Sequence, residues 1–410
     1  MADMKAVGII CEYNPFHTGH ARQIELLRDM GYDCIVCVMS GNFTQRGELA
    51  MFDKYTRAKS AVLGGADLVL ELPFPYCSLS AEGFATSGVH ILNSLGIKDI
   101  SFGSECADKE LLISAANAIS SSEFIQAYQA AQKSGSKGST RAFFDTLGEV
   151  MGKDISLLSN DILAISYISA IKRLGCDMNV IVIKREGLAY NDTALLDGRL
   201  PSASAIRETI SYGEGIDGAL ISAAIPEQAM SAIRDAINSG TAPVTAQNIG
   251  REILSFFKTM SADEIISRAA KRSASGAYIG DDGCGICERL CNSARQALDF
   301  DEFMTGAYNA KYTDARINRV SLFALLGVSD AHARSLPQYT TLLAASKAGR
   351  SLLSLLRKSC EYSVITKPAD APDGVQTRIS RAADEIYTAA MPKRKKSDFF
   401  VKSKPYMADK

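Results

Sequence analysis

The sequence predicts a doubly wound, parallel α/β domain followed by a mainly α-helical segment. Over about the first 215 residues, short apolar and β-branched runs alternate with stretches of helical spacing. This alternation favours right-handed crossovers between parallel strands. Beyond residue 215 the strand signal fades. The 410 residues exceed what one ordinary domain core holds, so two or three domains are expected.

The first predicted strand, Ala6–Cys11, is apolar and β-branched, as a strand buried on both faces of a sheet should be, and the other predicted strands are short β-rich runs. The five strands are expected at Ala6–Cys11, Cys34–Met39, Asp67–Leu72, Asp99–Phe102 and Asn179–Ile183. Helices are expected at 18–30, 54–63, 80–95 and through 108–174. The first carries Ile24, Leu27 and Met30 at three-residue spacing, which is a helical stripe. Ligands of such sheets bind beyond the carboxyl ends of strands, so the loops after strands are the informative places.

The chain is expected to divide into three parts, residues 1–215, 216–392 and 393–410. Helical spacing in the second part is found at 228–238, 245–259, 262–272, 317–326 and 340–357. The last part is a basic C-terminal tail. We interpret its Lys393–Lys396 run as part of a disordered, soluble tail, with an RNA-contacting arm as the alternative.

Composition narrows the class of protein. Apolar residues make up 47% of the chain and charged residues 22%, which excludes global disorder. The net charge of −1 argues neither for nor against a polyanionic partner. No run reaches the length of a membrane-spanning helix, so no membrane partner is expected. Ten cysteines are too few for a disulfide framework, and the reducing cytoplasm is the expected location.

The strongest chemical signal is His17-Thr18-Gly19-His20, at the turn from the first predicted strand into the first helix. Two histidines three residues apart share a helical face, and the helix N-terminus favours an anion. Gly19 permits close approach of a nucleotide, and Pro15 fixes the preceding turn. The two imidazoles are predicted to bind phosphate oxygens and offset the charge of phosphoryl transfer. The alternative is that they only cap the helix or lie in the core.

A second motif, Ser202–Arg207, opens a later helix. Ser202 and Ser204 suit an N-cap, and Arg207 is placed to form paired hydrogen bonds with phosphate oxygens. By itself the motif is equally consistent with a plain helix start. Together with the histidine pair, it is similar to the Ser/Thr-rich, Arg-ending motif of the HxGH nucleotidylyltransferases, which have a Rossmann-like fold.

Several segments, spread in order over about three quarters of the chain, resemble the tRNA(Met) cytidine acetate ligase family. They are Gly8–His20, Met39–Gly47, Gly65–Pro73, Ser101–Glu105, Ser159–Leu163, Lys184–Gly187, Ser202–Arg207 and Thr313–Arg319. The resemblance implies ATP-dependent activation of acetate as acetyl-adenylate. Transfer to N4 of the wobble cytidine of elongator tRNA(Met) follows, with AMP and pyrophosphate as products. It also implies a helical second domain that supports the tRNA.

The resemblance also assigns roles to residues. His17 and His20 would stabilise the α- and β-phosphates, and Arg207 the departing pyrophosphate. The implied ATP-binding residues are Val7, Gly8, Ile9, Ile10, Cys11, Glu12, Tyr13, Asn14, Pro15, Phe16, His17, Thr18, Gly19, His20, Gly103, Asn160, Arg185, Glu186, Ser204 and Arg207. Mg²⁺ is expected to be held through phosphates and waters, because no dedicated carboxylate cluster is found.

The RNA-binding residues leave alternatives open. One basic cluster is formed by Lys311, Arg316 and Arg319. Its side chains are predicted either to contact phosphates of the RNA or to form a solvated helix face. A flipped anticodon base needs aromatic stacking. The candidates for that stacking, which could equally be core residues, are Tyr13, Phe16 and Phe43.

Other signals are weaker. Asn160 either fixes the adenylate or acceptor base, or is a plain N-cap. Cys284, Cys287 and Cys291 resemble half of a zinc site, but a structural role is favoured and no metal is expected. Two other functions compete with the ligase: a nucleotidylyltransferase acting on a small metabolite, and a non-catalytic RNA-binding protein that holds ATP as a structural ligand.

Overall fold

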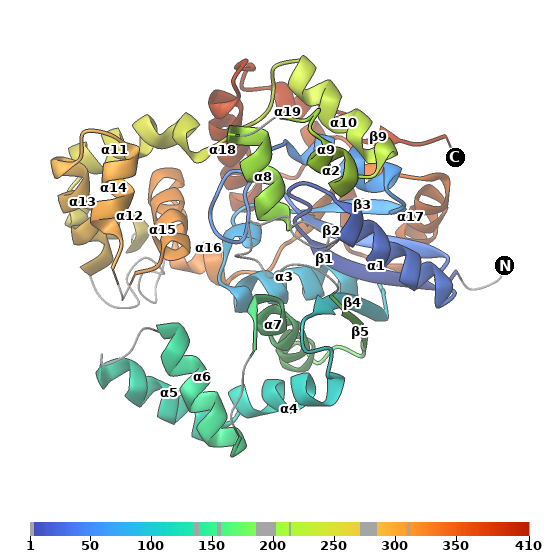
Figure 1. Cartoon of the computed structure of the whole chain (residues 1–410), viewed down its shortest axis with the longest axis horizontal. Helices are drawn as coiled ribbons and strands as arrows, with labels where there is room; N and C mark the ends of the chain where they lie inside the picture. Colours follow the sequence, from blue (N-terminus) through green and yellow to red (C-terminus); the bar gives the residue numbers. More distant parts are fainter. Residues whose placement is uncertain are drawn as a thin grey trace.

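The computed structural model of the protein describes residues 4–134, 139–153, 157–185, 202–212, 215–270, 285–309 and 312–409. Within these residues an eight-stranded sheet has the order β5-β4-β1-β2-β3-β7-β8, and β9 pairs with β7 (Figure 1). The strands are β1 Ala6–Cys11, β2 Cys34–Ser40, β3 Leu68–Leu72, β4 Asp99–Ser104, β5 Asn179–Lys184, β7 Tyr339–Ala345, β8 Ser363–Ile365 and β9 Tyr406–Met407. The five strands predicted from the sequence are all present, and the predicted α/β fold is confirmed.

Strands β1 to β5 run parallel, and their order in the sheet creates a topological switch point, where the direction in which strands are added reverses. From β1 the chain adds β2 and β3 on one side, and then returns to add β4 and β5 on the other side. The carboxyl ends of β1 and β4 therefore flank the position where ligands bind in doubly wound sheets.

The central strands contribute to two cores because successive side chains of a strand point to opposite faces. On β2, Ile35, Cys37 and Met39 join one core, and the residues between them join the other. Helices α1, α2, α8, α9 and α10 cover the first face, while α3, α7 and α17 are among those that cover the second. Burial on both faces explains why β1 and β2 are largely apolar.

The helices of the first half largely match the predicted ranges. They are α1 Thr18–Asp29, α2 Lys54–Leu63, η1 Tyr76–Ser78, α3 Ala81–Ser94, α4 Lys109–Ile119, α5 Ser122–Ser134, α6 Ser139–Met151, α7 Ser159–Arg173 and α8 Ala203–Tyr212. Helices α5 and α6 pack against each other away from the sheet (Figure 1).

Of the helices of the second half, α11 to α16 gather on the left of Figure 1, whereas α9, α10, α18 and α19 lie at the top and α17 lies on the right. The helices of this half are α9 Ala219–Ala224, α10 Glu227–Asn238, η2 Ala246–Ile249, α11 Gly250–Thr259, α12 Ala262–Ala270, α13 Gly285–Gln296, α14 Phe300–Ala307, α15 Asp314–Leu326, α16 Asp330–Arg334, α17 Lys347–Ser359, η4 Pro368–Asp370, α18 Val375–Ala390 and α19 Phe399–Lys402. Among the helices in the described part of the chain, none combines the length and apolar character needed to cross a bilayer.

The helix predicted over 340–357 is wrong in its first part. Tyr339–Ala345 forms β7, which runs antiparallel to β3, and α17 begins only at Lys347. Because β7 is buried along its whole length, it lacks the two-residue alternation that distinguishes a strand from a buried helix. The segment expected to be mainly helical therefore adds strands to the sheet. The boundaries at residues 215 and 392 stay predictions.

The disordered tail predicted for the last residues is also wrong. Phe400 of α19 is 1% exposed, and β9 pairs in parallel with β7. Burial of one aromatic ring and a short strand pairing stabilise a segment whose composition alone indicates disorder.

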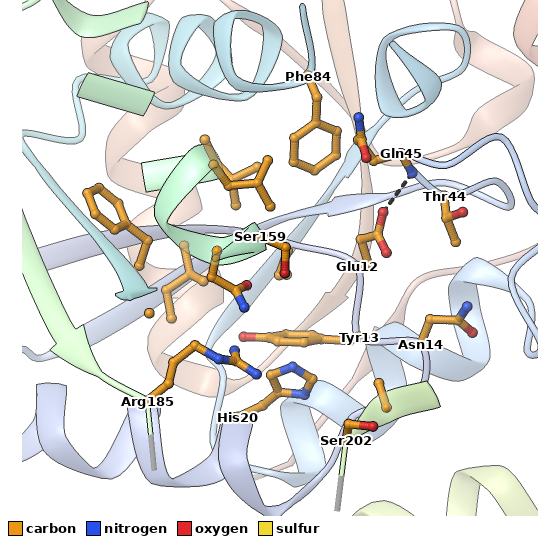
Figure 2. A pocket seen from close by; sticks show the side chains of 18 of the residues that line it. Glu12, Tyr13, Asn14, His20, Thr44, Gln45, Phe84, Ser159, Arg185 and Ser202 are labelled. Carbon is orange, nitrogen blue, oxygen red and sulfur yellow. Dashed lines mark hydrogen bonds between the residues drawn. The ribbon is translucent and has the colours of Figure 1, made fainter. Parts of the chain in front are cut away.

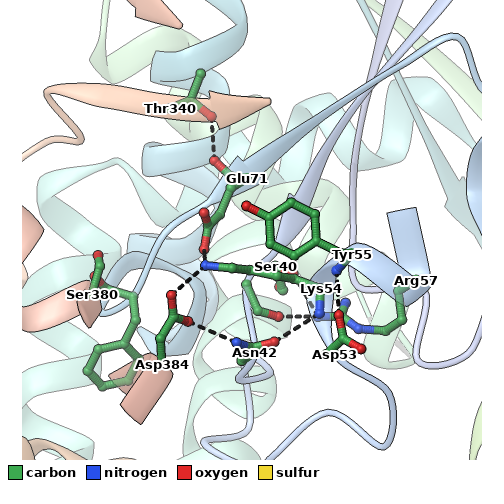
Figure 3. A network of polar contacts seen from close by, with 12 residues as sticks. Ser40, Asn42, Asp53, Lys54, Tyr55, Arg57, Glu71, Thr340, Ser380 and Asp384 are labelled. Atoms are coloured by element: carbon green, nitrogen blue, oxygen red, sulfur yellow. Dashed lines mark hydrogen bonds and ion pairs between the residues drawn. The ribbon is translucent and has the colours of Figure 1, made fainter. Parts of the chain in front are cut away.

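A buried polar network connects α18 to the sheet (Figure 3). Lys54 Nζ lies 2.8 Å from Glu71 Oε1 and 2.8 Å from Asp384 Oδ2. Asn42 donates through Nδ2 to Asp384 and accepts from Lys54 N through Oδ1, both at 2.8 Å. Such a network specifies one arrangement of the packed elements, because breaking it leaves a charge buried without a partner.

Candidate active site

A cavity of about 380 Å³ opens at the switch point, beyond the carboxyl ends of β1 and β4 (Figure 2). Its walls come from the β1–α1 turn, the loops that follow β2, β4 and β5, and the first turns of α3, α7 and α8. Segments far apart in the sequence meet here because parallel strands end at the same edge of the sheet.

His17 and His20 lie at the start of α1, and both line the cavity. Nδ1 of His17 accepts a hydrogen bond from Gly19 N at 3.0 Å, and Nδ1 of His20 accepts one from His17 N at 3.2 Å. The two rings stack, with centroids 3.7 Å apart. Because each Nδ1 is an acceptor, the proton of each neutral ring lies on Nε2. Each imidazole therefore caps the helix with one nitrogen and retains an N–H donor on the other.

Both imidazoles are neutral at pH 7. Burial, assisted by the charge of Arg185, lowers the pKa of His17 to about 3. Burial, His17 and Arg185 together lower the pKa of His20 well below its usual value. The rings therefore offer uncharged donors in the free protein. The positive potential for an anion comes instead from the N-terminus of α1, from Arg185 and from Arg207.

Arg207 reaches the cavity from the second turn of α8. Its Nη1 donates to Asn14 O at 2.9 Å, and its Nη2 donates to Ser204 Oγ at 3.2 Å. Ser202 Oγ accepts from Ala205 N at 3.2 Å. The Ser202–Arg207 motif thus starts a helix, and it also fixes an arginine in the wall of the cavity.

Asp161 organises the loop after β4 from the first turn of α7, where it is 1% exposed. Its carboxylate oxygens accept four hydrogen bonds of 2.6–3.2 Å, from Ser104 Oγ and from the backbone N–H groups of Glu105, Cys106 and Leu158. Burial raises the pKa of Asp161, but these hydrogen bonds outweigh it and leave the pKa below its usual value. An ionised Asp161 therefore holds the loop against the helix.

Glu105 extends this arrangement to the cavity. It accepts from Asn160 Nδ2 and from Asp161 N, and it lies 3.8 Å from Arg185 Nε. The N-cap alternative for Asn160 is wrong, because α7 begins at Ser159 and its N-cap is Leu158. Asn160 lines the cavity as a polar side chain fixed by Glu105.

Glu12 lies on another side of the cavity from the imidazoles. Figure 2 shows Glu12 and Gln45 on one side of the Tyr13 ring, with His20 and Arg185 on the other. Glu12 Oε1 accepts from Gln45 N at 2.6 Å, and its other carboxylate oxygen has no hydrogen-bond partner among the described residues. Burial raises the pKa of Glu12, although the Gln45 hydrogen bond and the arginines of α8 and α2 oppose that rise.

The structure brings most of the residues predicted to bind ATP to the cavity wall. They are Ile9, Ile10, Cys11, Glu12, Tyr13, Asn14, His17, His20, Gly103, Asn160, Arg185 and Arg207. The other described ones lie off the wall: Val7, Gly8, Pro15, Phe16, Thr18, Gly19 and Ser204. Val7 and Phe16 are core residues, and a Cβ at Gly8 would clash with Leu92. Glu186 lies outside the described residues.

Sequence reasoning missed several side chains of the cavity. They include Gln23, Thr44, Gln45, Arg46, Glu48, Phe84, Glu105, Ser159, Leu163, Tyr167 and Ser202. A signal was present for some of them, because the loops 42–48 and 105–108 directly follow predicted strands. The others come from helices, whose contribution depends on packing.

The predicted RNA contacts have mixed outcomes. Arg316 and Arg319 lie half-buried on α15, and Arg319 Nη1 donates to Gln45 O at 3.5 Å. Helix α15 therefore borders the loop that lines the cavity. Lys311 lies outside the described residues. The stacking roles considered for Phe16 and Phe43 are wrong, because both rings are 0% exposed.

The described residues contain no group of three or more His, Cys, Asp or Glu side chains placed to hold a metal ion. Cys287 and Cys291 are buried on α13. Cys284 lies outside the described residues.

Comparison with known families agrees with this geometry. The family described as HIGH Nucleotidyl Transferase matches residues 4–400. The α/β fold, the switch-point cavity and the paired histidines thus define a nucleotidyl transferase of this class.

Relatives narrow the class further. The tRNA(Met) cytidine acetate ligase of Acetivibrio thermocellus is 32% identical, over 90% of this chain and 89% of that protein. The one of Clostridium perfringens is 30% identical, over 97% and 98%. Two crystal structures of Thermotoga maritima TmcAL, one apo and one bound with alpha-thio ATP, match at TM-scores of 0.85 and 0.83. Both are 28% identical, over 99% of this chain and 100% of theirs. The chain belongs to the tRNA(Met) cytidine acetate ligase family.

Proposed function

We propose that this protein activates acetate with ATP and transfers the acetyl group to N4 of the wobble cytidine of elongator tRNA(Met). One observation carries the proposal: two stacked, neutral imidazoles line a switch-point cavity. The similarity to tRNA(Met) cytidine acetate ligases over nearly the whole chain supports it, as does the alpha-thio ATP bound to the Thermotoga maritima neighbour.

In the first step, an acetate oxygen attacks the α-phosphorus of ATP. The bond between that phosphorus and the oxygen bridging to the β-phosphorus breaks, giving acetyl-adenylate and pyrophosphate. His17 and His20 donate through Nε2–H to phosphate oxygens at the N-terminus of α1. Arg207 and Arg185 supply positive charge as negative charge gathers on the leaving pyrophosphate. Positioning and electrostatics dominate, because this step asks little covalent chemistry of the protein.

In the second step, the cytidine amine attacks the acetyl carbonyl, AMP departs, and the nitrogen loses a proton. Glu12 is the residue we assign to accept that proton. Its second carboxylate oxygen has no partner among the described residues, and burial raises its pKa, which makes the carboxylate a stronger base. A carboxylate is also the group that recognises the amine of cytosine.

Mg²⁺ fits this cavity as an ion held mainly by phosphates and waters. Nucleotide-bound Mg²⁺ typically takes one or two carboxylates from the protein, and Glu48 lines the wall. We propose that the reaction takes place in the cytoplasm, where a tRNA substrate is found.

The test uses the purified chain with ATP, labelled acetate, and either tRNA(Met), another tRNA or no RNA. We expect acetate-dependent release of pyrophosphate, and label in tRNA(Met) that is recovered as N4-acetylcytidine after digestion. Release of pyrophosphate with a metabolite in place of acetate, and none with acetate, would overturn the proposal in favour of a metabolite nucleotidylyltransferase. Binding of RNA with no pyrophosphate release under any condition would indicate a non-catalytic RNA-binding protein.

A further inference from the structure

The C-terminal residues 393–404, here called the basic strap, form a strongly charged surface of the described chain. The strap contains six basic residues and one acidic residue, Asp398. Five of the basic side chains are exposed: Lys393, Arg394, Lys396, Lys402 and Lys404. Within the described residues, only Lys402 forms an ion pair, with Asp398. Such a density of positive charge repels itself, and a polyanion would offset that repulsion.

The backbone of the strap is held in place at both ends. Lys393 N donates to Gly240 O at 2.7 Å, and Ala408 N donates to Ala345 O at 2.9 Å. Between these points Phe400 is buried. A ligand of the strap therefore meets charges on an ordered backbone, and binding does not cost the entropy of ordering a free tail.

Aromatic and hydroxyl groups lie among the charges. A cavity of about 660 Å³ beside the strap is lined by Lys59, Lys395 and Lys404, by the rings of Phe399 and Tyr406, and by the hydroxyl-bearing side chains Thr56, Ser239 and Thr241. Asp53 and Asp235 also line it, and Asp235 forms an ion pair with Lys59, so Lys395 and Lys404 are the lysines left for a ligand. Phe399 is half-buried, and Lys395 Nζ lies 5.6 Å from the centre of its ring. The ammonium groups of Lys395 and Lys404 suit phosphate oxygens, and aromatic faces suit unstacked bases.

The strap lies at the same edge of the sheet as the candidate active site. Helix α2 begins beyond the carboxyl end of β2, and Asp53 and Thr56 at its start line the cavity beside the strap. The next residue, Arg57, donates to the carbonyl oxygen of Glu12 in the active-site turn. One helix turn thus contacts both surfaces.

We propose that the basic strap is an RNA-binding surface that holds the phosphodiester backbone of the tRNA outside the anticodon loop, while the wobble base occupies the active site. This inference rests on the proposed function. A membrane of anionic lipid would also be attracted by lysines, but Phe400 of the strap is buried and Phe399 is half-buried, which leaves little apolar surface to insert into a bilayer. The polar, aromatic-lined cavity fits nucleotides better than it fits a lipid surface.

The experiment compares two triple variants with the same change of charge. The strap variant is Arg394→Ala/Lys396→Ala/Lys404→Ala. The control is Lys109→Ala/Lys347→Ala/Lys358→Ala, which removes three exposed lysines from α4 and α17. All six side chains are exposed and have no ion pair among the described residues, so both variants should fold, which thermal unfolding checks.

Three readings are taken: acetate-dependent exchange of pyrophosphate into ATP, the KM for tRNA(Met), and the salt dependence of tRNA binding. We expect the strap variant to raise the KM for tRNA about tenfold and to reduce the slope of log affinity against log salt by about 2 to 3. Pyrophosphate exchange should stay as in the wild type. The control variant should change neither the KM for tRNA nor the salt dependence of tRNA binding.

An unchanged KM for tRNA in the strap variant, with exchange intact, would overturn the inference. So would loss of binding to phosphatidylserine vesicles without any change in tRNA affinity, which would assign the strap to a membrane. A wild-type protein that lacks exchange and acetylates no RNA would instead be a failure of the proposed function.

Discussion

Replacing His17 by asparagine separates the two tasks that its imidazole performs. Nδ1 caps α1 by accepting from Gly19 N at 3.0 Å, while the same ring lines the cavity with its Nε2–H donor. Asparagine is a preferred N-cap residue, and its side-chain oxygen can accept the same hydrogen bond. It has no second donor at the reach of Nε2. His17→Ala, by contrast, loses both the cap and the donor.

The two losses have different magnitudes and different readouts. Removal of an N-cap costs about 1 kcal/mol of unfolding free energy. Removal of one preorganised donor to a developing negative charge costs about 3 kcal/mol in the transition state, or roughly 100-fold in rate. His17→Ala should therefore be less stable and slow, whereas His17→Asn should be nearly as stable as the wild type and equally slow.

The assay is acetate-dependent exchange of pyrophosphate into ATP, measured beside urea unfolding of the same preparations. Exchange by His17→Asn within about threefold of the wild type, a loss of less than 1 kcal/mol, would refute the reasoning. It would mean that the imidazole serves only as a cap, which is the alternative that the sequence left open.

Three further predictions test other parts of the structure. The pKa of His17 falls to about 3 on folding because the ring is buried. The unfolded chain therefore binds a proton below about pH 6.5 that the folded protein does not, so the free energy of unfolding falls by up to about 1.4 kcal/mol per pH unit below that pH. Urea unfolding from pH 7 to 4 should show a smaller loss for His17→Asn than for the wild type. Asp161→Ala leaves four donors without their acceptor and should lower the free energy of unfolding by about 4 kcal/mol. Asp108→Ala, which removes an exposed N-cap, should lower it by about 1 kcal/mol. Equal losses in the two variants would contradict the role given to Asp161. Glu12→Gln should leave pyrophosphate exchange within a few-fold of the wild type, and should slow acetyl transfer to tRNA about 100-fold in rapid-quench experiments; an equal loss in both steps would mean that Glu12 serves ATP instead.

Local pattern was sufficient for strands β1 to β5 and for the turn between β1 and α1. A strand buried on both faces needs a continuous apolar run, and a helix packed on one face needs a stripe, so both leave a signal within ten or so residues. The histidine pair is equally local, because its members are three residues apart at one helix start. Strand β7 was not predicted because it is buried along its whole length. A short apolar run of this kind has the same pattern in a buried strand and in a buried helix.

By itself, the sequence determined the first five strands and the helices between them, the helix end that receives an anion, and the residue types that face it. The tertiary structure decided which distant groups complete the site: Asp161 fixes the loop after β4 across 55 or more residues of sequence, and Lys54 reaches Asp384 across 330. It also decided that the basic strap is folded. Contacts between residues so far apart in the sequence depend on how whole helices and strands pack, and they produce no periodic pattern in the sequence. For that reason, neither the polar wall of the cavity nor the anchored strap could be predicted from local pattern.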